Sequence, residues 1–310
     1  MADVSVVIPL YNKASHIVET VESVQRQTYQ PTEILVVDDG STDGGATLVE
    51  SMNDPRIEII RTERARSGPS AARNIGIWQA KGDWIALLDA DDTWETTHLA
   101  SLTKLIERDR LLTCAFSSWQ IIYPDGRRSQ DACGKQIQGE QVFDFDAFLE
   151  LWLRRRSCPM WTSATLIRRS ELIAIGGFPS EYRRGEDKAT WLRLMERGRG
   201  AYSSVPAAHY NKAVVGQESS RFEPFLHPVV LIAERMIKEM RHPPATLRKL
   251  QRVSNLVTWQ YARQAAFRRP IPDSFLDKFY WREGYASYLA LQIIRLFDFM
   301  RLRLLQRRSA

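Results

Sequence analysis

The first ninety or so residues constrain the fold most, because short apolar segments alternate there with segments of helical periodicity. Val4–Ile8 and Glu33–Val37 are short, rich in β-branched residues and bounded by turn residues, as buried parallel strands usually are. Ser15–Gln27, which lies between them, carries apolar residues at helical spacing. A strand, a helix and a second strand in this order predict a βαβ unit at the start of the chain.

The same alternation continues along the chain and becomes less regular after Asp92. The expected segments are helices at Thr47–Met52, Ser70–Gln79 and Leu99–Arg108, and strands at Ile57–Ile60, Trp84–Leu88 and Leu112–Ile122. A Pro124-Asp125-Gly126 turn after the last of these strands predicts a hairpin. We therefore predict a layered α/β domain, of Rossmann-like type, with a mainly parallel central sheet.

The C-terminal part of the chain differs in pattern and in charge. Beyond Phe222 the strand signals stop, and the helical pattern is interrupted at Pro243-Pro244 and at Pro270–Pro272. From Arg235 onwards there are 16 Lys and Arg against 5 Asp and Glu, whereas the residues before it hold 27 against 32. We predict an α/β domain over residues 1–222 and a basic helical region over 223–310, which meet different partners.

Composition excludes several classes of protein. With 44% hydrophobic and 26% charged residues, the chain is neither disordered nor of low complexity. It has no uncharged apolar run of the roughly 18 residues that a transmembrane helix needs. The N-terminal residues are typical of a first strand rather than of a signal peptide. Cys114, Cys133 and Cys158 lack metal-site spacing and are odd in number, so we expect a reducing, cytoplasmic location.

Two acidic clusters directly follow predicted strands. Asp38-Asp39-Gly40-Ser41-Thr42-Asp43-Gly44 follows the second strand, and Asp89-Ala90-Asp91-Asp92 follows the fourth, about fifty residues later. Ligands of open α/β sheets bind beyond the carboxyl ends of the strands, and carboxylates there can hold a hard divalent cation. Each cluster alone is equally typical of a solvated turn. Their combination in one domain favours a site.

The segment Ser67–Gly76 lies between these clusters and begins with small residues at a predicted helix start. Small residues allow a ligand to approach backbone amides, and Arg73 offers a cation for phosphate or for bracing carboxylates. The alternative is a capped helix with a surface arginine.

Glu186 and Asp187 stand at the start of a further predicted helix, whose apolar face carries Trp191, Leu194 and Met195. Carboxylates in a first helical turn often only stabilise the helix dipole. They can equally include a general base directed into a cleft. The pattern alone leaves both interpretations open.

Taken together, these segments resemble an inverting family 2 glycosyltransferase with the nucleotide-diphospho-sugar transferase (GT-A) fold. The resemblance covers roughly residues 3–222, with all motifs in order. It rests on Val6-Val7-Ile8-Pro9-Leu10-Tyr11-Asn12, the Asp-Asp-Gly-Ser-Thr-Asp segment, Ala72-Arg73-Asn74-x-Gly76, Asp89-Ala90-Asp91-Asp92 and Glu186-Asp187.

The resemblance implies that residues 1–120 bind the nucleotide-sugar and that residues 121–222 form the acceptor side. Pro9 and Tyr11 would line the nucleoside pocket, and Asp39 would accept a hydrogen bond from the base, commonly uracil in this family. Asp38 or Asp43 would assist Asp39. Arg73 would also belong to the donor site.

The resemblance further implies a metal ion and a catalytic base. Asp91 would bind Mg²⁺ or Mn²⁺, with Asp92 as the alternative principal ligand. Asp89 and Asp92 would bind the sugar or the ribose, or would contact the metal through water. Asp187 would deprotonate the acceptor hydroxyl, with Glu186 as the alternative base. A metal at Asp91 neutralises the diphosphate leaving group, and a general base typically contributes about 10²–10⁴-fold.

The expected function is a metal-dependent, non-processive inverting transfer from a nucleotide-diphospho-sugar, with a UDP-sugar as the expected donor. The acceptor would be a hydroxyl of a glycan or polyprenol-linked glycan in cell-surface polysaccharide or glycoconjugate biosynthesis. One base and no separate nucleophile indicate direct displacement. Processive relatives carry a Gln-x-x-Arg-Trp motif and membrane helices. In the segment Gln217–Phe222 the glutamine and the arginine are spaced differently from that motif, so we expect a non-processive enzyme. His209 and Tyr210–Ser220 fall where related enzymes place an acceptor-side loop.

Two other functions share some of these features. A sugar nucleotidyltransferase should carry a glycine-rich basic loop after strand one, which Pro9-Leu10-Tyr11-Asn12 is not. A non-catalytic sugar-binding scaffold is disfavoured because the acidic positions are all present. We expect no nucleic-acid partner, since the aromatic residues of the basic region favour packing or membrane contact.

At the end of the basic region, the spacing of the apolar residues predicts a helix over Tyr285–Gln306 with one apolar face. That face comprises Leu289, Ile293, Leu296, Phe297, Met300 and Leu304. Its apolar and basic character predicts peripheral docking on an anionic membrane surface, at the inner face of the plasma membrane. Packing on the α/β domain or on a partner subunit is the alternative, and the oligomeric state stays open.

Overall fold

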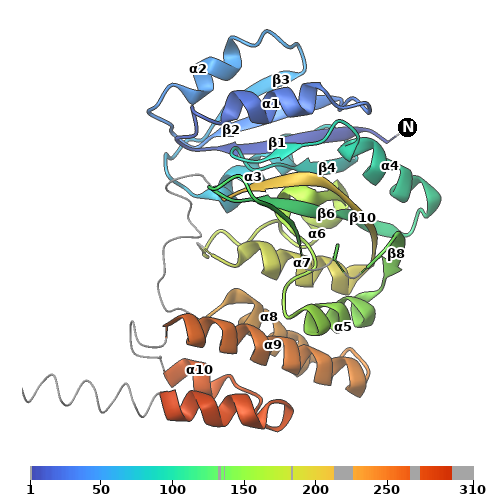
Figure 1. Cartoon of the computed structure of the whole chain (residues 1–310), viewed down its shortest axis with the longest axis vertical. Coiled ribbons are helices and arrows are strands. Elements are labelled where there is room, and N and C mark those ends of the chain that lie inside the picture. The colour runs from blue at the N-terminus through green and yellow to red at the C-terminus, as the bar shows by residue number, and fades with distance from the viewer. Residues whose placement is uncertain are drawn as a thin grey trace, which may run out of the picture. The chain divides into compact units, whose positions relative to one another are not determined.

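The computed structural model describes residues 2–131, 134–135, 137–182, 184–212, 226–265 and 273–294. The chain divides into two compact units (Figure 1). The first comprises Met1–Phe148 and Cys158–Val215, and the second comprises Leu149–Ser157 and Gly216–Ala310.

The first unit is built on one sheet with strand order β3-β2-β1-β4-β9-β6-β10-β5. Its strands are β1 (Val4–Leu10), β2 (Glu33–Asp38), β3 (Ile57–Arg61), β4 (Trp84–Leu87), β5 (Thr93–Trp94), β6 (Leu112–Ile122), β7 (Arg128–Gln130), β8 (Glu140–Phe143), β9 (Thr165–Arg168) and β10 (Arg199–Asn211). Strands β1 to β4 pair in parallel, and β9 enters antiparallel between β4 and β6. Because β10 runs parallel to β6, the strands β1, β2, β3, β4, β6 and β10 share one direction. The predicted α/β class with a mainly parallel sheet is confirmed.

Helices cover both faces of this sheet. On one face, alternate residues of β1 such as Val6 and Ile8 pack in a single core with α1 (Ile17–Gln25), α2 (Gly45–Glu50) and α4 (His98–Arg108). On the other face lies α3 (Pro69–Gln79), which contacts β1 and β2. A Cβ at Gly76 would lie 2.5 Å from Cγ1 of Val7, so this close helix–strand approach requires glycine.

Helices α6 (Arg169–Ala174) and α7 (Glu186–Arg197) continue the layer begun by α3, since α3 contacts α6 and α6 contacts α7. The predicted β1–β4, α1, α3, α4 and α7 are confirmed, and β6 and β7 form the expected hairpin. The helix expected from Thr47 begins instead at Gly45, directly after Gly44 in the left-handed conformation (φ 81°). The sequence pattern did not reveal β9 or β10.

The second unit is helical, as predicted. Its helices are α8 (Pro228–Glu239), α9 (Pro244–Ala265), α10 (Asp273–Asp277) and the part of α5 (Phe145–Arg155) from Leu149 onwards. Residues 285–294 are helical as well, and residues 295–306 of the helix predicted over Tyr285–Gln306 lie outside the described part of the chain. Phe275, Phe279 and Leu291 form its small apolar core, and the Lys278 ammonium lies 2.7 Å from the Glu234 carboxylate. The helix break at Pro243-Pro244 is confirmed, whereas Pro270–Pro272 lie outside the described residues.

Two further observations concern the described part of the chain. None of its helices is both long enough and apolar enough to span a membrane. Cys114 and Cys158 are buried free thiols, and Cys133 lies outside the described residues.

Candidate active site

The loops that follow β1 and β2 are joined by hydrogen bonds at the carboxyl edge of the sheet. The backbone N–H of Asn12 donates to Oγ of Ser41 (3.1 Å), and Thr42 N–H donates to Oδ1 of Asn12 (2.8 Å). Ala14 N–H donates to Oδ2 of Asp43 (2.8 Å). These bonds fix the first loop on both sides of Lys13, and they give Asp43 a structural partner rather than an open position.

The carboxylates of Asp38 and Asp39 are buried and accept hydrogen bonds from loops. Oδ1 of Asp38 accepts from the N–H of Ser41, at 2.9 Å. Asp39 accepts from the N–H groups of Ser67 (3.0 Å) and Gly68 (2.8 Å), and so positions the loop before α3. The Oδ1 atom of Asp39 also accepts from the hydroxyls of Thr62 (3.0 Å) and Ser67 (2.5 Å), whereas Oδ2 accepts only from Gly68 among the described residues. The predicted role of Asp39 in base recognition would therefore use Oδ2.

Pro9 and Tyr11, the residues expected to line the nucleoside pocket, are both partly exposed. The guanidinium carbon of Arg66 lies 5.7 Å from the centre of the Tyr11 ring. Arg66 belongs to the same loop that Asp39 positions, since its N–H donates to the carbonyl of Asp39 (2.9 Å). Tyr11 and the Asp39 loop are therefore brought together, as the resemblance implies.

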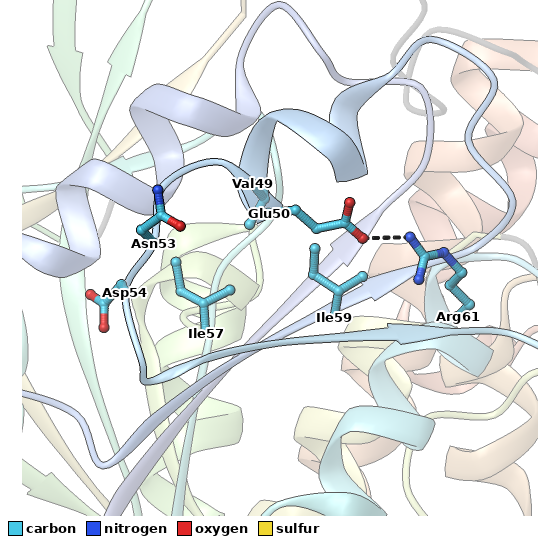
Figure 2. A pocket seen from close by; sticks show the side chains of 7 residues that line it. All are labelled: Val49, Glu50, Asn53, Asp54, Ile57, Ile59 and Arg61. Carbon is cyan, nitrogen blue, oxygen red and sulfur yellow. Dashed lines mark hydrogen bonds and ion pairs between the residues drawn. The ribbon is translucent and has the colours of Figure 1, made fainter.

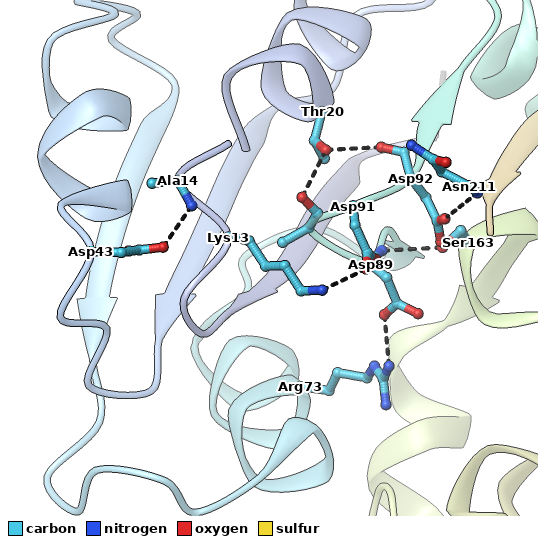
Figure 3. A network of polar contacts seen from close by, with 11 residues as sticks. Lys13, Ala14, Thr20, Asp43, Arg73, Asp89, Asp91, Asp92, Ser163 and Asn211 are labelled. Atoms are coloured by element: carbon cyan, nitrogen blue, oxygen red, sulfur yellow. Dashed lines mark hydrogen bonds and ion pairs between the residues drawn. The ribbon is translucent and has the colours of Figure 1, made fainter. Parts of the chain in front are cut away.

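The three aspartates that follow β4 point to three different partners (Figure 3). The contacts are Asp89 Oδ1 to Arg73 Nη2 at 2.6 Å, Asp91 Oδ2 to Lys13 Nζ at 2.8 Å, and Asp92 Oδ2 to the Ser163 hydroxyl at 2.6 Å. The backbone of this loop is held by Thr20, whose hydroxyl lies within hydrogen-bond distance of the carbonyls of Ala90 (3.0 Å) and Asp92 (2.9 Å). The sequence placed these carboxylates together but did not identify Lys13, Thr20 or Ser163.

Asp92 differs from Asp91 in its surroundings. Its side chain is buried, accepts from Ser163 and also accepts from the N–H of Asn211 at 3.3 Å. Burial raises the pKa of Asp92 well above its usual range, and the charges of Asp89 and Asp91 add to this effect. The Asp91 side chain is 13% exposed. Asp91 is therefore the more accessible carboxylate of the two.

The carboxylate oxygens of the loop after β4 are of the kind that a hard divalent cation prefers as ligands. Within the described residues no group of three or more His, Cys, Asp or Glu side chains is placed to hold a metal ion together. Mg²⁺ and Mn²⁺ sites that serve phosphates commonly use only one or two carboxylates and complete their shell with phosphate oxygens and water. Asp91, with Asp89 and Asp92 on the same short loop, meets that requirement.

Arg73 connects two parts of the site. This buried residue of α3 contacts Asp89, and its Nη1 also lies 3.4 Å from Oε1 of Glu186. Burial by itself lowers the pKa of Arg73, but the charges of Asp89 and Glu186 outweigh it and raise the pKa. The guanidinium also lies 5.3 Å from the centre of the Phe178 ring. Arg73 is thus a permanent cation that braces carboxylates, one of its two predicted roles.

Glu186 and Asp187 begin α7 as predicted, after Gly185 in the left-handed conformation (φ 77°). Glu186 is buried, and this burial raises its pKa to about 7; the charge of Asp187 adds to the shift and that of Arg73 opposes it. Asp187 is partly exposed. The buried Trp191 anchors the helix, with its ring 5.6 Å from that of Phe178. The two adjacent carboxylates therefore sit in different environments.

Three aromatic side chains adjoin the partners of Asp92. Trp161 lies between Trp119 and Tyr210, with ring centroids 5.5 and 5.4 Å apart, and all three are partly exposed. Trp161 starts the turn η1 (Thr162–Ala164), which holds Ser163, while Tyr210 directly precedes Asn211. Sequence analysis did not single out this aromatic cluster.

His209 contacts residues of the neighbouring strand rather than the aspartates. Its Nε2 lies 3.1 Å from the carboxylate of Glu95, and its Nδ1 lies 3.5 Å from the hydroxyl of Thr93. Of the acceptor-side segment Tyr210–Ser220 expected from the resemblance, residues 213–220 lie outside the described part of the chain.

A separate hollow of about 330 Å³ lies between α2 and β3 (Figure 2). Glu50 and Arg61 form an ion pair at one side of it (2.6 Å). It is lined by Val49, Glu50, Asn53, Asp54, Ile57, Ile59 and Arg61. None of the predicted site residues is among them.

Comparison with known proteins gives a family match for the segment that contains the acidic loops. The family model described as Glycosyl transferase family 2 matches residues 5–170. The WfaP protein of Escherichia coli, a UDP-Glc:alpha-D-GlcNAc-diphosphoundecaprenol beta-1,3-glucosyltransferase, is 30% identical over 217 residues, which cover 70% of this chain and 80% of WfaP. The putative teichuronic acid biosynthesis glycosyltransferase TuaG of Bacillus subtilis is 32% identical over 204 residues, 64% of this chain and 74% of TuaG.

Other relatives are much longer than the matched region. The chain spans only 27% of the length of an uncharacterized glycosyltransferase of Rickettsia bellii, to which it is 29% identical over 63% of its own length.

Among solved structures, Staphylococcus aureus TarS 1–349 in complex with UDP-GlcNAc superposes with a TM-score of 0.75 at 18% identity, covering 99% of this chain and 92% of that one. The mannosyltransferase PcManGT of Pyrobaculum calidifontis, in complex with GDP-Man and Mn²⁺, gives a TM-score of 0.58 at 21% identity, with coverage of 96% and 90%. At these identities the likeness shows the fold, which is that of the GT-A glycosyltransferases.

Proposed function

The chain belongs to glycosyl transferase family 2, and on that premise we propose that it transfers a sugar from a nucleotide-diphospho-sugar to a hydroxyl of a glycan acceptor. A UDP-sugar donor is supported by the name of WfaP and by the UDP-GlcNAc bound to TarS. A polyprenol-linked glycan acceptor is supported by the substrate in the WfaP name, and a place in cell-surface polysaccharide biosynthesis by the TuaG name.

The observation that carries this proposal is the double contact of Arg73. One guanidinium lies against Asp89, after β4, and against Glu186, at the start of α7. The loop after β4, which we assign to the sugar donor, and the start of α7, which carries the proposed base, are thereby held close together although they are far apart in the sequence. Adjacent leaving-group and base positions are what a direct displacement at one carbon requires.

The proposed reaction is a single displacement with inversion. The Asp187 carboxylate takes the proton of the acceptor hydroxyl, whose oxygen forms a bond to the anomeric carbon of the donor sugar. The bond between that carbon and the diphosphate oxygen breaks, and the nucleoside diphosphate leaves with the electron pair. Asp187 is favoured over Glu186 because it is partly exposed, whereas Glu186 is buried against Arg73.

Asp91 would hold Mg²⁺ or Mn²⁺, with Asp92 as the alternative ligand, and Asp89 and Arg73 would contribute to the donor site. The bound ion would supply positive charge next to the departing diphosphate. Mn²⁺ in the PcManGT complex supports a metal in this fold. Pro9, Tyr11 and Asp39 would bind the nucleoside, with Asp38 supporting the loop.

The aromatic cluster of Trp119, Trp161 and Tyr210 would lie on the acceptor side. Partly exposed rings can pack against the apolar faces of sugar rings, and the cluster adjoins the partners of Asp92. Trp161 and Tyr210 belong to residues 121–222, which we assign to the acceptor, whereas Trp119 lies just before them, at the end of residues 1–120, which we assign to the donor. Transfer would be non-processive, adding one or few sugars.

The basic helical region over 223–310 would place the enzyme on an anionic membrane surface, at the inner face of the plasma membrane. Support comes from an exposed stripe of Tyr285 (60%), Leu289 (42%) and Ile293 (55%), spaced four residues apart on the helix over 285–294, and from Trp281 (50%) in the 3₁₀ turn before that helix. Together with the basic residues of this region, these side chains have the composition of an interfacial segment.

The proposal is tested by incubating the protein and Mn²⁺ with a panel of UDP-, GDP- and dTDP-sugars and a polyprenol-diphosphate-linked sugar acceptor. We expect one class of donor to yield a product whose new linkage has the opposite anomeric configuration, as read by NMR. A product with retained configuration would contradict direct displacement.

A further inference from the structure

Lys13 is the cation in contact with Asp91, the carboxylate expected to bind the metal. Its Nζ atom lies 2.8 Å from Oδ2 of Asp91, and the two side chains are 19% and 13% exposed. We propose that this ammonium group reserves the metal position: it neutralises Asp91 in the free protein, so that the divalent cation binds well only together with the nucleoside diphosphate. The inference rests on the proposed function and assigns a positioning role to Lys13.

The backbone of Lys13 is fixed by hydrogen bonds that do not involve its side chain. Hydrogen bonds on either side of it hold Asn12 and Ala14 to the β2–α2 loop, and the Lys13 carbonyl accepts from the N–H groups of His16 and Ile17, both at 2.9 Å. The side chain of a lysine whose backbone is held in this way still has a flexible stem of four carbons and a compact terminal charge. It can therefore leave Asp91 without any rearrangement of the loop.

Arg73 and Lys13 both contact aspartates of the same loop, but only Lys13 is suited to exchange. Arg73 is buried and contacts two carboxylates, and its departure would take a counter-charge away from the buried Glu186. Asp91 is the single ion-pair partner of Lys13 among the described residues, and the pair is partly open to water. Because both side chains are largely shielded from water, the pair separates only where each charge finds a new counter-charge, which a diphosphate and a metal ion would supply.

The charge of Lys13 would make the binding of the metal ion depend on the binding of the nucleoside diphosphate. A divalent cation and an ammonium group are both positive, so they oppose each other at one carboxylate. The negative oxygens of a nucleoside diphosphate can pair with the Lys13 ammonium group in place of Asp91. The Asp91 carboxylate is then available to bind the metal. Coupling of this kind is reciprocal, so the metal must strengthen nucleotide binding by the same factor.

The test measures Mn²⁺ binding by electron paramagnetic resonance, with and without saturating UDP, in the full chain. In the wild type we expect UDP to tighten Mn²⁺ binding by about 5–150-fold, the usual range of such couplings. Lys13→Gln should bind Mn²⁺ alone several-fold more tightly than the wild type and lose most of the UDP enhancement. Lys13→Arg, which keeps the cation, should retain weak Mn²⁺ binding without UDP. Lys81→Gln, at an exposed lysine paired with Glu33 and Glu58, is the matched control.

The outcomes separate this inference from the proposed function. If UDP enhances Mn²⁺ binding equally in the wild type and in Lys13→Gln, and Mn²⁺ alone binds both equally, the role of Lys13 is wrong while the nucleotide-sugar function stands. If the wild type binds none of UDP, GDP and dTDP in the presence of Mn²⁺, both are wrong; if it binds GDP or dTDP instead of UDP, the same comparison is made with that nucleotide. Thermal unfolding of each variant checks that the fold is retained.

Discussion

The Nη2 atom of Arg73 lies 2.6 Å from Oδ1 of Asp89, and this contact joins helix α3 to the loop after strand β4. The same guanidinium reaches Glu186 on α7. A single buried cation thus holds three elements at the carboxyl edge of the sheet. It contacts Asp89, to which we assign donor binding, and Glu186, the neighbour of Asp187, to which we assign proton transfer.

Arg73→Gln should destabilise the protein by about 3 kcal/mol, because it leaves the buried Glu186 and the partly exposed Asp89 without this cation. The measurement is urea unfolding at pH 8, followed by circular dichroism. Arg197→Gln is the control, since Arg197 is 44% exposed and pairs with Glu171 at the surface; its cost should stay below about 1 kcal/mol. Equal losses for the two variants would show that Arg73 does not brace the site.

Asp187→Asn should leave donor binding intact and lower transfer by roughly 10²–10⁴-fold, because the amide keeps the shape of the carboxylate but accepts no proton. Donor binding is measured by calorimetric titration with UDP, and transfer by nucleoside diphosphate release. Glu186→Gln should have the smaller effect on transfer. The assignment of the base is reversed if Glu186→Gln carries the whole loss.

Glu186 also predicts a dependence of stability on pH. Its pKa in the folded chain is raised from 4.5 to about 7, so between these pH values the folded chain keeps a proton that the unfolded chain has released. This group therefore lowers the free energy of unfolding as pH rises through that window, by up to about 1.4 kcal/mol per pH unit. Glu186→Gln removes the effect.

The stability of Glu186→Gln relative to the wild type should consequently increase from pH 4.5 to pH 7 and then level off. Urea unfolding at half-unit pH steps measures the difference. Glu22→Gln, at an exposed residue paired with Arg26, is the control for the loss of a carboxylate elsewhere on the surface. A flat profile for Glu186→Gln would contradict the raised pKa.

Much of this site could be predicted because its parts are local in sequence. The acidic loops follow strands with a clear apolar pattern, and Glu186 and Asp187 start a helix with a clear apolar face. The order of strands and helices therefore placed the loops at one edge of a sheet. Bracing of carboxylates was one of the roles that the sequence left open for Arg73, and only its contacts with Asp89 and Glu186 identify it.

The remainder depends on contacts between distant segments. Strand β9 is four residues long, and only its pairing with β4 and β6 identifies it. The burial of Asp92 depends on Ser163 and Asn211, which lie far along the chain. Likewise, the spacing of Lys13 gives no sign that its ammonium reaches Asp91. These features arise from tertiary packing, which a pattern of residue types does not encode.

The exposed stripe of the helical region predicts binding to vesicles with anionic lipid. Leu289→Gln combined with Ile293→Gln should reduce flotation with such vesicles several-fold, because each change removes apolar surface from the interface. Leu111→Gln, at a residue that is 73% exposed in the first unit, is the control and should float like the wild type. Unchanged flotation of the double variant would indicate that the stripe serves another purpose.

The central claim is that Asp91 and a divalent metal activate a nucleotide-sugar for transfer. It is tested most directly by the rate of nucleoside diphosphate release from the preferred donor, measured with Mn²⁺, with EDTA, and in Asp91→Asn with Mn²⁺. Asp125→Asn, at an exposed hairpin residue, is the control. We predict at least a roughly 100-fold loss with EDTA and in Asp91→Asn, since each removes charge stabilisation of the leaving group, and no loss in Asp125→Asn. Release that continues at the wild-type rate in EDTA and in Asp91→Asn would contradict the account.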